Sequence, residues 1–263
     1  SYSNAFGIYG SAWPEIVSNE IYNLSSSPVN MSMFSNPYFE NNTVWNVERM
    51  TLDIKRETYS QDDTIPQRDF GGYQNITYYV PNTLEINNGT KIHVPAGTVF
   101  KGNGGFRING NFQVMGTANN PVVFTSLADD DYGNPADANL DGSSTSPSNY
   151  YNSNAWLQFD DVSNDSSLVK NAVIRYRDEG ISLISAAPTL DSVLFDGGQR
   201  GIEMTGKSRP NIWNNTFHNL DYEPIAVSLV AYPDSVRDNT LSGSTWKAIR
   251  VNDETLTEDA LLE

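Results

Sequence analysis

The sequence has no cysteine among its 263 residues, which excludes disulfide bonds, thiolate-bound metals and thiol redox chemistry. It also has no apolar run near the roughly 20 residues that cross a bilayer. The N-terminal residues lack the basic and then apolar order of a signal peptide. We therefore expect no membrane span in this segment, and any export signal of the intact protein would lie outside it.

Basic residues are scarce, with 16 Lys and Arg against 32 Asp and Glu, a formal net charge of −16. Such a surface repels phosphate backbones and anionic membranes, so we expect no nucleic-acid partner. Clustered carboxylates become tolerable when a divalent cation neutralises them. The composition therefore favours a cation-binding protein.

The two ends of the chain resemble each other. Residues 14–33 align without a gap to residues 210–229, with seven identities in twenty positions at an offset of 196. Residues 52–62 align to residues 249–259 at an offset of 197. This repeat predicts that residues 1–66 are the C-terminal coils of one unit and residues 67–263 a following unit. Neighbouring units of the same protein or filament are the expected partners.

A shorter repeat marks individual coils. Ile181, Ile202, Ile225 and Ile249 begin similar segments at spacings of 21, 23 and 24 residues, and strand-like runs bounded by Gly, Asn, Asp, Ser or Pro lie between them. Such short strands bury their inner faces only by stacking on their own copies. We therefore predict an all-β fold, a right-handed single-stranded parallel β-helix (solenoid) with an Asp-rich loop insertion.

Asparagine is expected at the corners of these coils. It tolerates the left-handed backbone conformation, and stacked Asn side chains bond one another along a solenoid axis. Asn19, Asn23, Asn215 and Asn219 occupy positions that fit this role.

Several segments in order, residues 84–126, Trp156–Phe159, 167–176 and 210–219, resemble bacterial and archaeal surface proteins with pectate-lyase-like parallel β-helix repeats. The resemblance covers roughly residues 80–230. It implies a right-handed β-helix and an extracellular or cell-surface location. It leaves function open, since such helices serve as adhesins, surface layers, carbohydrate-binding stalks and polysaccharide-cleaving enzymes.

The strongest candidate site is an Asp-rich insertion at residues 126–151. Asp137, Asn139, Asp141 and Gly142 reproduce the first half of a calcium loop, D-x-N-x-D-G. Position 12 of the full motif is Ser148 and not the usual Glu, so the helix-loop-helix version is disfavoured. The resembling family's Asp-rich loops suggest that the missing charge comes from Asp129, Asp130 or Asp131. We expect a structural calcium ion; the alternative is a solvated acidic loop without an ion.

Two other kinds of site are weaker. Tyr150, Tyr151 and Trp156, beside the insertion, are candidates for contact with glycans through ring stacking. A lyase or hydrolase would need convergent ionisable groups, for which the sequence offers Asp160, Asp161, Asp178, Glu179, Arg175 and Arg177. Their spacing is typical of an ordinary charged strand surface, so no catalytic residue is predicted.

The sequence thus predicts an extracellular structural or adhesive β-helix module of a larger repetitive surface protein, stabilised by calcium. The alternative is a polysaccharide-binding or polysaccharide-cleaving β-helix domain.

Overall fold

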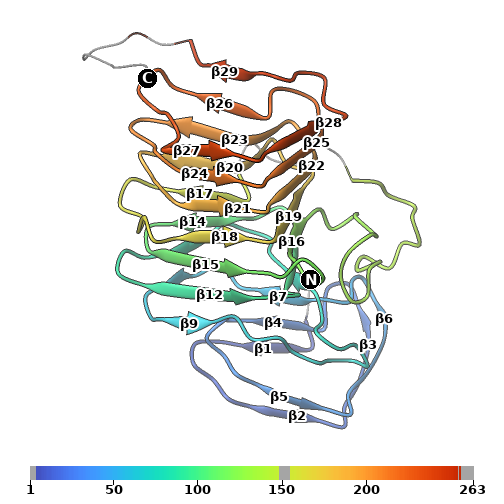
Figure 1. Ribbon diagram of the computed structural model, residues 1–263. Coiled ribbons are helices and arrows are strands. Elements are labelled where there is room, and N and C mark those ends of the chain that lie inside the picture. Colours follow the sequence, from blue (N-terminus) through green and yellow to red (C-terminus); the bar gives the residue numbers. More distant parts are fainter. Residues whose placement is uncertain (1–3, 148–154, 254, 256–263) are drawn as a thin grey trace.

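The computed structural model describes residues 4–147, 155–253 and 255, and these form a parallel β-solenoid of about ten turns (Figure 1). Every pairing between strands is parallel, as predicted from stacked coils. The described residues contain strands, turns and bends but no helix, so none of them forms a membrane-spanning helix.

Three long sheets make up the walls of the solenoid. Sheet 1 runs along its whole length and contains β1 (Phe6–Ile8), β4 (Val29–Met31), β7 (Leu52–Ile54), β10 (Tyr78–Tyr79), β13 (Val99–Lys101), β16 (Val122–Thr125), β19 (Ala172–Arg175), β22 (Leu194–Gly198), β25 (Thr216–Leu220) and β28 (Thr240–Ser242). Sheet 2 contains β8 (Thr58–Tyr59), β11 (Leu84–Ile86), β14 (Phe106–Ile108), β17 (Leu157–Phe159), β20 (Glu179–Ile184), β23 (Arg200–Thr205), β26 (Ile225–Val227) and β29 (Ile249–Val251). Sheet 3 contains β9 (Asp63–Thr64), β12 (Lys91–Pro95), β15 (Asn111–Met115), β18 (Leu168–Lys170), β21 (Thr189–Asp191), β24 (Asn211–Trp213) and β27 (Ser235–Arg237).

The first two coils are closed by separate short sheets. β2 (Glu15–Val17) pairs with β5 (Tyr38–Glu40), and β3 (Glu20–Leu24) pairs with β6 (Thr43–Val47). Figure 1 shows these blue strands at the end of the molecule, below the stack. Only sheet 1 continues from them into the later coils, through the pairing of β7 with β10. A junction loop, residues 65–77, lies between β9 and β10.

The predicted coil register is confirmed. Ile181 pairs with Ile202, Ile202 with Ile225, and Ile225 with Ile249, all within sheet 2. The first three side chains are buried and face the shared interior. Sheet 1 contributes a parallel ladder in which Tyr78, Phe100 and Phe124 occupy successive rungs. The Phe100 and Phe124 rings stack with centroids 5.3 Å apart, so the core is one continuous apolar column.

Asparagine plays both predicted corner roles, divided between different positions. Asn23 and Asn219 have left-handed backbone angles, with φ of 58° and 51°. Asn19 and Asn215 instead bond to the next coil, the Asn215 Nδ2 donating to the Oδ1 of Asn239 at 3.1 Å. The Asn215 amide also donates to the Leu190 carbonyl, which satisfies a buried backbone group at the bend.

Candidate metal centre in the acidic insertion

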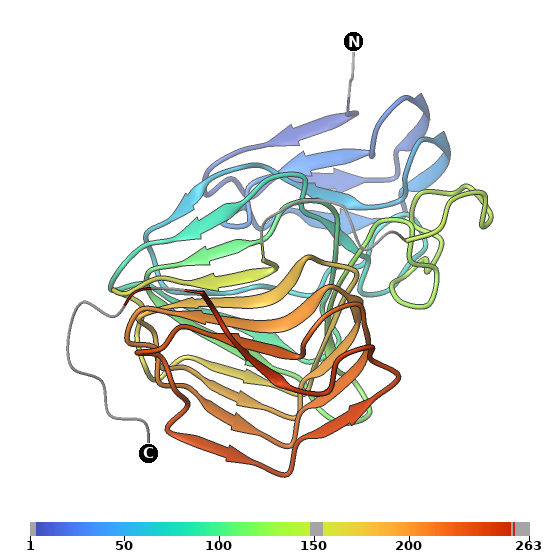
Figure 2. The same ribbon diagram turned by 90° about the horizontal axis from the view of Figure 1, so that it is seen from above.

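The insertion leaves the solenoid after β16 and returns at β17. Its described part, residues 126–147, projects from the side of the stack in both views (Figure 1 and Figure 2). Its inner portion lies over the outward-facing row of sheet 1. The register of that row places Tyr79, Lys101, Thr125, Arg175 and Asp196 next to one another. A row of polar side chains therefore forms the floor on which the acidic insertion rests.

Lys101 anchors the insertion from below. Its side chain is fully buried, and its Nζ donates to the Asp129 carbonyl at 2.5 Å and to the Ala136 carbonyl. Burial lowers the pKa of this ammonium group to about 8, against the opposing effect of the nearby aspartates. No local motif in the sequence indicates this role of Lys101, because its partners lie 28 and 35 residues away.

Arg175 anchors the insertion from the neighbouring coil. Its Nη1 lies 3.0 Å from Asp129 Oδ2 and 2.7 Å from Asp131 Oδ2, and its Nε lies 3.0 Å from Asp196 Oδ2. Asp129 also accepts from Thr125 Oγ1 and from the Asp131 backbone. Two of the predicted metal ligands, Asp129 and Asp131, therefore pair with a guanidinium group and are not among the three aspartates that meet at the candidate metal centre.

The cluster consists of Asp130, Asp137 and Asp141. One carboxylate oxygen from each lies within 4.8 Å of the others, a spacing that one metal ion can bridge. All three side chains are half-buried. The sequence offered Asp129, Asp130 or Asp131 as a further carboxylate for the calcium motif, and in the structure Asp130 is the one that meets Asp137 and Asp141.

Two oxygen atoms in this part of the insertion have no hydrogen-bond donor. Asp130 Oδ1 and Asn139 Oδ1 are both inaccessible to solvent and accept no hydrogen bond. Buried acceptors without partners are costly, and a bound cation is one kind of partner that satisfies a buried oxygen. Desolvation and the neighbouring carboxylate of Asp137 raise the pKa of Asp130, and the nearby Lys101 ammonium opposes this rise.

The backbone shapes the cluster through a tight turn. The amides of Asp141 and Gly142 donate to the two carboxylate oxygens of Asp137, at 3.1 Å and 2.9 Å. Gly142, at position 6 of the motif, has a φ of 64°, the conformation that its sharp turn requires. The Thr145 hydroxyl and then the backbone amides of residues 143–145 donate to Asp141, and these bonds lower the pKa of its carboxyl.

The insertion also contacts the junction between the early and later coils. The Ala138 carbonyl accepts from the Met50 amide at 2.8 Å, and the Asn134 amide donates to Thr77 Oγ1 at 2.9 Å. The Asn134 side chain donates to the Gln74 carbonyl in the junction loop. The insertion therefore ties together coils on both sides of the junction.

The three residues predicted to contact glycans do not form a described ring platform. Tyr150 and Tyr151 lie outside the described residues. Trp156 is fully buried, with the Arg177 guanidinium 4.2 Å from its ring centroid and the Arg175 carbonyl 3.3 Å from its Nε1. Trp156 is thus a core residue with no ring face open to a sugar, because its apolar ring follows Phe124 into the interior column.

The candidate catalytic groups do not gather into one site. Asp160 pairs with Arg107 at 2.5 Å, and Arg177 is buried under Trp156. Glu179 is different. Burial, together with the neighbouring carboxyl group of Glu203 on the next coil, raises the pKa of Glu179 to about 8.

No known protein family, curated protein or solved structure matches this chain.

Proposed function

We propose that this chain is a rigid structural or adhesive module of a larger repetitive extracellular or cell-surface protein, and that a calcium ion in the insertion stabilises it. The observation that carries the calcium proposal is the meeting of three carboxylates, one of which, that of Asp130, has a buried oxygen that accepts no hydrogen bond. Calcium prefers such all-oxygen ligand sets. The resemblance to pectate-lyase-like surface β-helices supports the proposed extracellular or cell-surface location.

The mechanical role follows from the ladders. Parallel pairing along sheet 1 continues through ten strands, and bending the solenoid would break stacked contacts on one side of the core. Calcium would act on this rod by fixing the insertion, which in turn holds Met50, Gln74 and Thr77 at the junction. The expected function of the ion is therefore stabilisation of one joint.

The experiment is calcium titration by calorimetry, with thermal unfolding measured in calcium and in chelator. At free calcium a hundred times the Kd, binding should stabilise the chain by about 2.7 kcal/mol. Asp137→Asn and Asp141→Asn should weaken binding, since each removes a charge from the cluster. Asp131→Asn is the matched control, because its carboxylate pairs with Arg175. Equal melting temperatures in calcium and chelator would refute the calcium proposal.

A second candidate function, cleavage of polysaccharide, is favoured by Glu179 and Glu203 alone. Two adjacent carboxyl groups, one of them kept protonated near neutral pH, form the kind of pair that divides acid and base roles. Arg200 lies beside both Glu203 and Glu223. The test is release of reducing ends from mixed polysaccharides by the unmodified chain and by Glu203→Gln; no release by the unmodified chain would exclude this candidate for the substrates tried.

A further inference from the structure

The offset that relates the ends of the sequence also relates strand to strand. β2, β3 and β4 coincide with β24, β25 and β26 at an offset of 196 residues. β5 and β7 coincide with β27 and β29 at an offset of 197 residues, and the first residues of β6 and β28 are related by the same offset. The pairings agree as well, since Val29 pairs with Leu52 as Ile225 pairs with Ile249. The last coils of the chain therefore have the architecture of its first coils.

These equivalent coils differ sharply in what covers them. Leu52 and Ile54 on β7 are fully buried, whereas their counterparts Ile249 and Val251 on β29 are 54% and 53% exposed. β7 is covered because β10 pairs with it, Tyr78 lying opposite Leu52. Among the described residues, β29 has no strand on its outer side.

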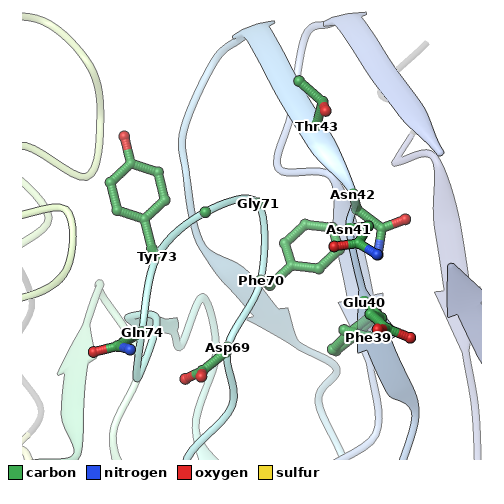
Figure 3. Close-up of a pocket in the computed structure, with 11 residues that line it drawn as sticks. Phe39, Glu40, Asn41, Asn42, Thr43, Asp69, Phe70, Gly71, Tyr73 and Gln74 are labelled. Carbon is green, nitrogen blue, oxygen red and sulfur yellow. The ribbon is translucent and has the colours of Figure 1, made fainter. Parts of the chain in front are cut away.

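The junction loop covers the rest of this face of the first coils, over β5 and β6. The Phe70 ring meets the Phe39 ring edge to face, 4.7 Å between centroids. Figure 3 shows Phe70 directed toward Asn41 and Asn42, in the turn that joins β5 to β6. These residues line a hollow of about 500 Å³.

The close fit of this loop is clearest at Gly71. A Cβ there would lie 2.2 Å from Met50 Cε and 3.0 Å from Val44 Cγ2. Val236 and Leu241, which correspond to Phe39 and Val44, are 50% and 38% exposed.

We infer that the end face formed by β27, β28 and β29 is the docking surface for a following repeat unit, which covers it with a segment equivalent to residues 67–80. The occupant is defined by what already covers the equivalent face: a short strand like β10 on the edge of β29, and an aromatic loop like residues 65–77 on Val236 and Leu241. This inference deepens the proposed role as a repeat module and does not depend on calcium.

A free second copy is not the occupant. In each copy, residues 58–80 are already part of the solenoid, with Ile65, Phe70 and Ile76 buried. The first strands of a copy, β1 to β3, correspond to β23 to β25. Within the solenoid, β23 to β25 stack on β20 to β22, so strands of this type do not match the face formed by β27 to β29. The register therefore requires a unit that continues along the same chain.

The junction would also exchange sheets. β29 belongs to sheet 2, but its counterpart β7 belongs to sheet 1 and pairs with β10 there. The ladder that leaves one unit in sheet 2 would thus enter the next unit in sheet 1. The other two ladders would stop at each junction, as they do after β5 and β6.

The test is a fusion in repeat register, in which residues 1–253 are followed by residues 57–263. Because the chain has no cysteine, Ile249→Cys or Val236→Cys placed in the first copy reports on that face alone through its rate of thiol labelling. Burial in a folded junction should slow labelling of both cysteines by about tenfold or more relative to the single unit. Trp13→Cys, at a residue 74% exposed on the first coils, should label at the same rate in both proteins.

A matched fusion carries Phe70→Asp in the second copy only. It should restore rapid labelling at Val236→Cys while Ile249→Cys, under the β10-like strand, stays protected. Unchanged labelling of both cysteines beside a folded second copy, shown by circular dichroism, would overturn the inference, as would failure of the second copy to fold. Repeating the measurement in chelator separates loss of the calcium site from loss of the junction.

Discussion

The guanidinium of Arg175 holds the carboxylate of Asp129, with Nη1 3.1 Å from Oδ1 and 3.0 Å from Oδ2. Asp129 belongs to the insertion and is 2% exposed, whereas Arg175 belongs to a later coil of sheet 1. This pair joins residues 46 positions apart and fixes the base of the candidate metal centre.

Removing the guanidinium should destabilise the chain strongly. Arg175→Met leaves the buried Asp129 carboxylate without its cation, and breaking a buried pair from one side costs about 3 to 5 kcal/mol. Urea denaturation measures the loss, and limited proteolysis should detect earlier cleavage within residues 126–147. The double variant Arg175→Met, Asp129→Leu removes both charges and should recover part of the stability; an additive loss would contradict the pairing.

The aromatic column gives a second prediction. Phe124 is fully buried between neighbouring rings of the core, so Phe124→Ala should cost about 3 to 5 kcal/mol through lost burial and the cavity left behind. Leu241 continues the same inward row at the last coil but is 38% exposed. Leu241→Ala should therefore lower the free energy of unfolding much less than Phe124→Ala does. Equal losses in denaturant unfolding would contradict the difference in burial between the two positions.

The Asn corners can be tested by separating their two roles. Asn215→Ala removes the partners of the Leu190 carbonyl and the Val193 amide, both buried, and should cost about 2 kcal/mol. Its neighbour Asn214 has a φ of 55° and an exposed side chain bond. Asn214→Gly keeps that backbone conformation without strain and should change stability by less than about 0.5 kcal/mol. Thermal unfolding of the two variants measures the difference.

Glu179 predicts a pH dependence of stability. Its pKa in the folded state is raised from 4.5 to about 8, so the folded state holds a proton that the unfolded state releases earlier. The stabilisation is complete below about pH 4.5 and is lost as the pH rises through about 8.

Glu179→Gln should remove this loss, making the variant more stable than the unmodified chain at alkaline pH and similar to it at acid pH. Denaturant unfolding across that range checks the prediction, with Glu85→Gln on the same sheet as control. A pH profile unchanged by Glu179→Gln would contradict it.

The repeated pattern of the sequence was sufficient to predict the architecture. The register of Ile181, Ile202, Ile225 and Ile249 follows from spacing alone, because a stacked coil can bury its strands only when equivalent residues lie over one another. The Asp137 to Gly142 turn is likewise a local property, since its glycine and alternate oxygens lie within six residues.

The tertiary structure decided which distant groups meet. It brought Asp130 to Asp137 and Asp141, gave Asp129 and Asp131 to Arg175, and placed Trp156 in the core beside Arg177. Sequence alone could not show that Asp129 and Trp156 are buried, because each bonds to Arg175, 46 and 19 residues away, and only the stacking of coils brings these residues into contact.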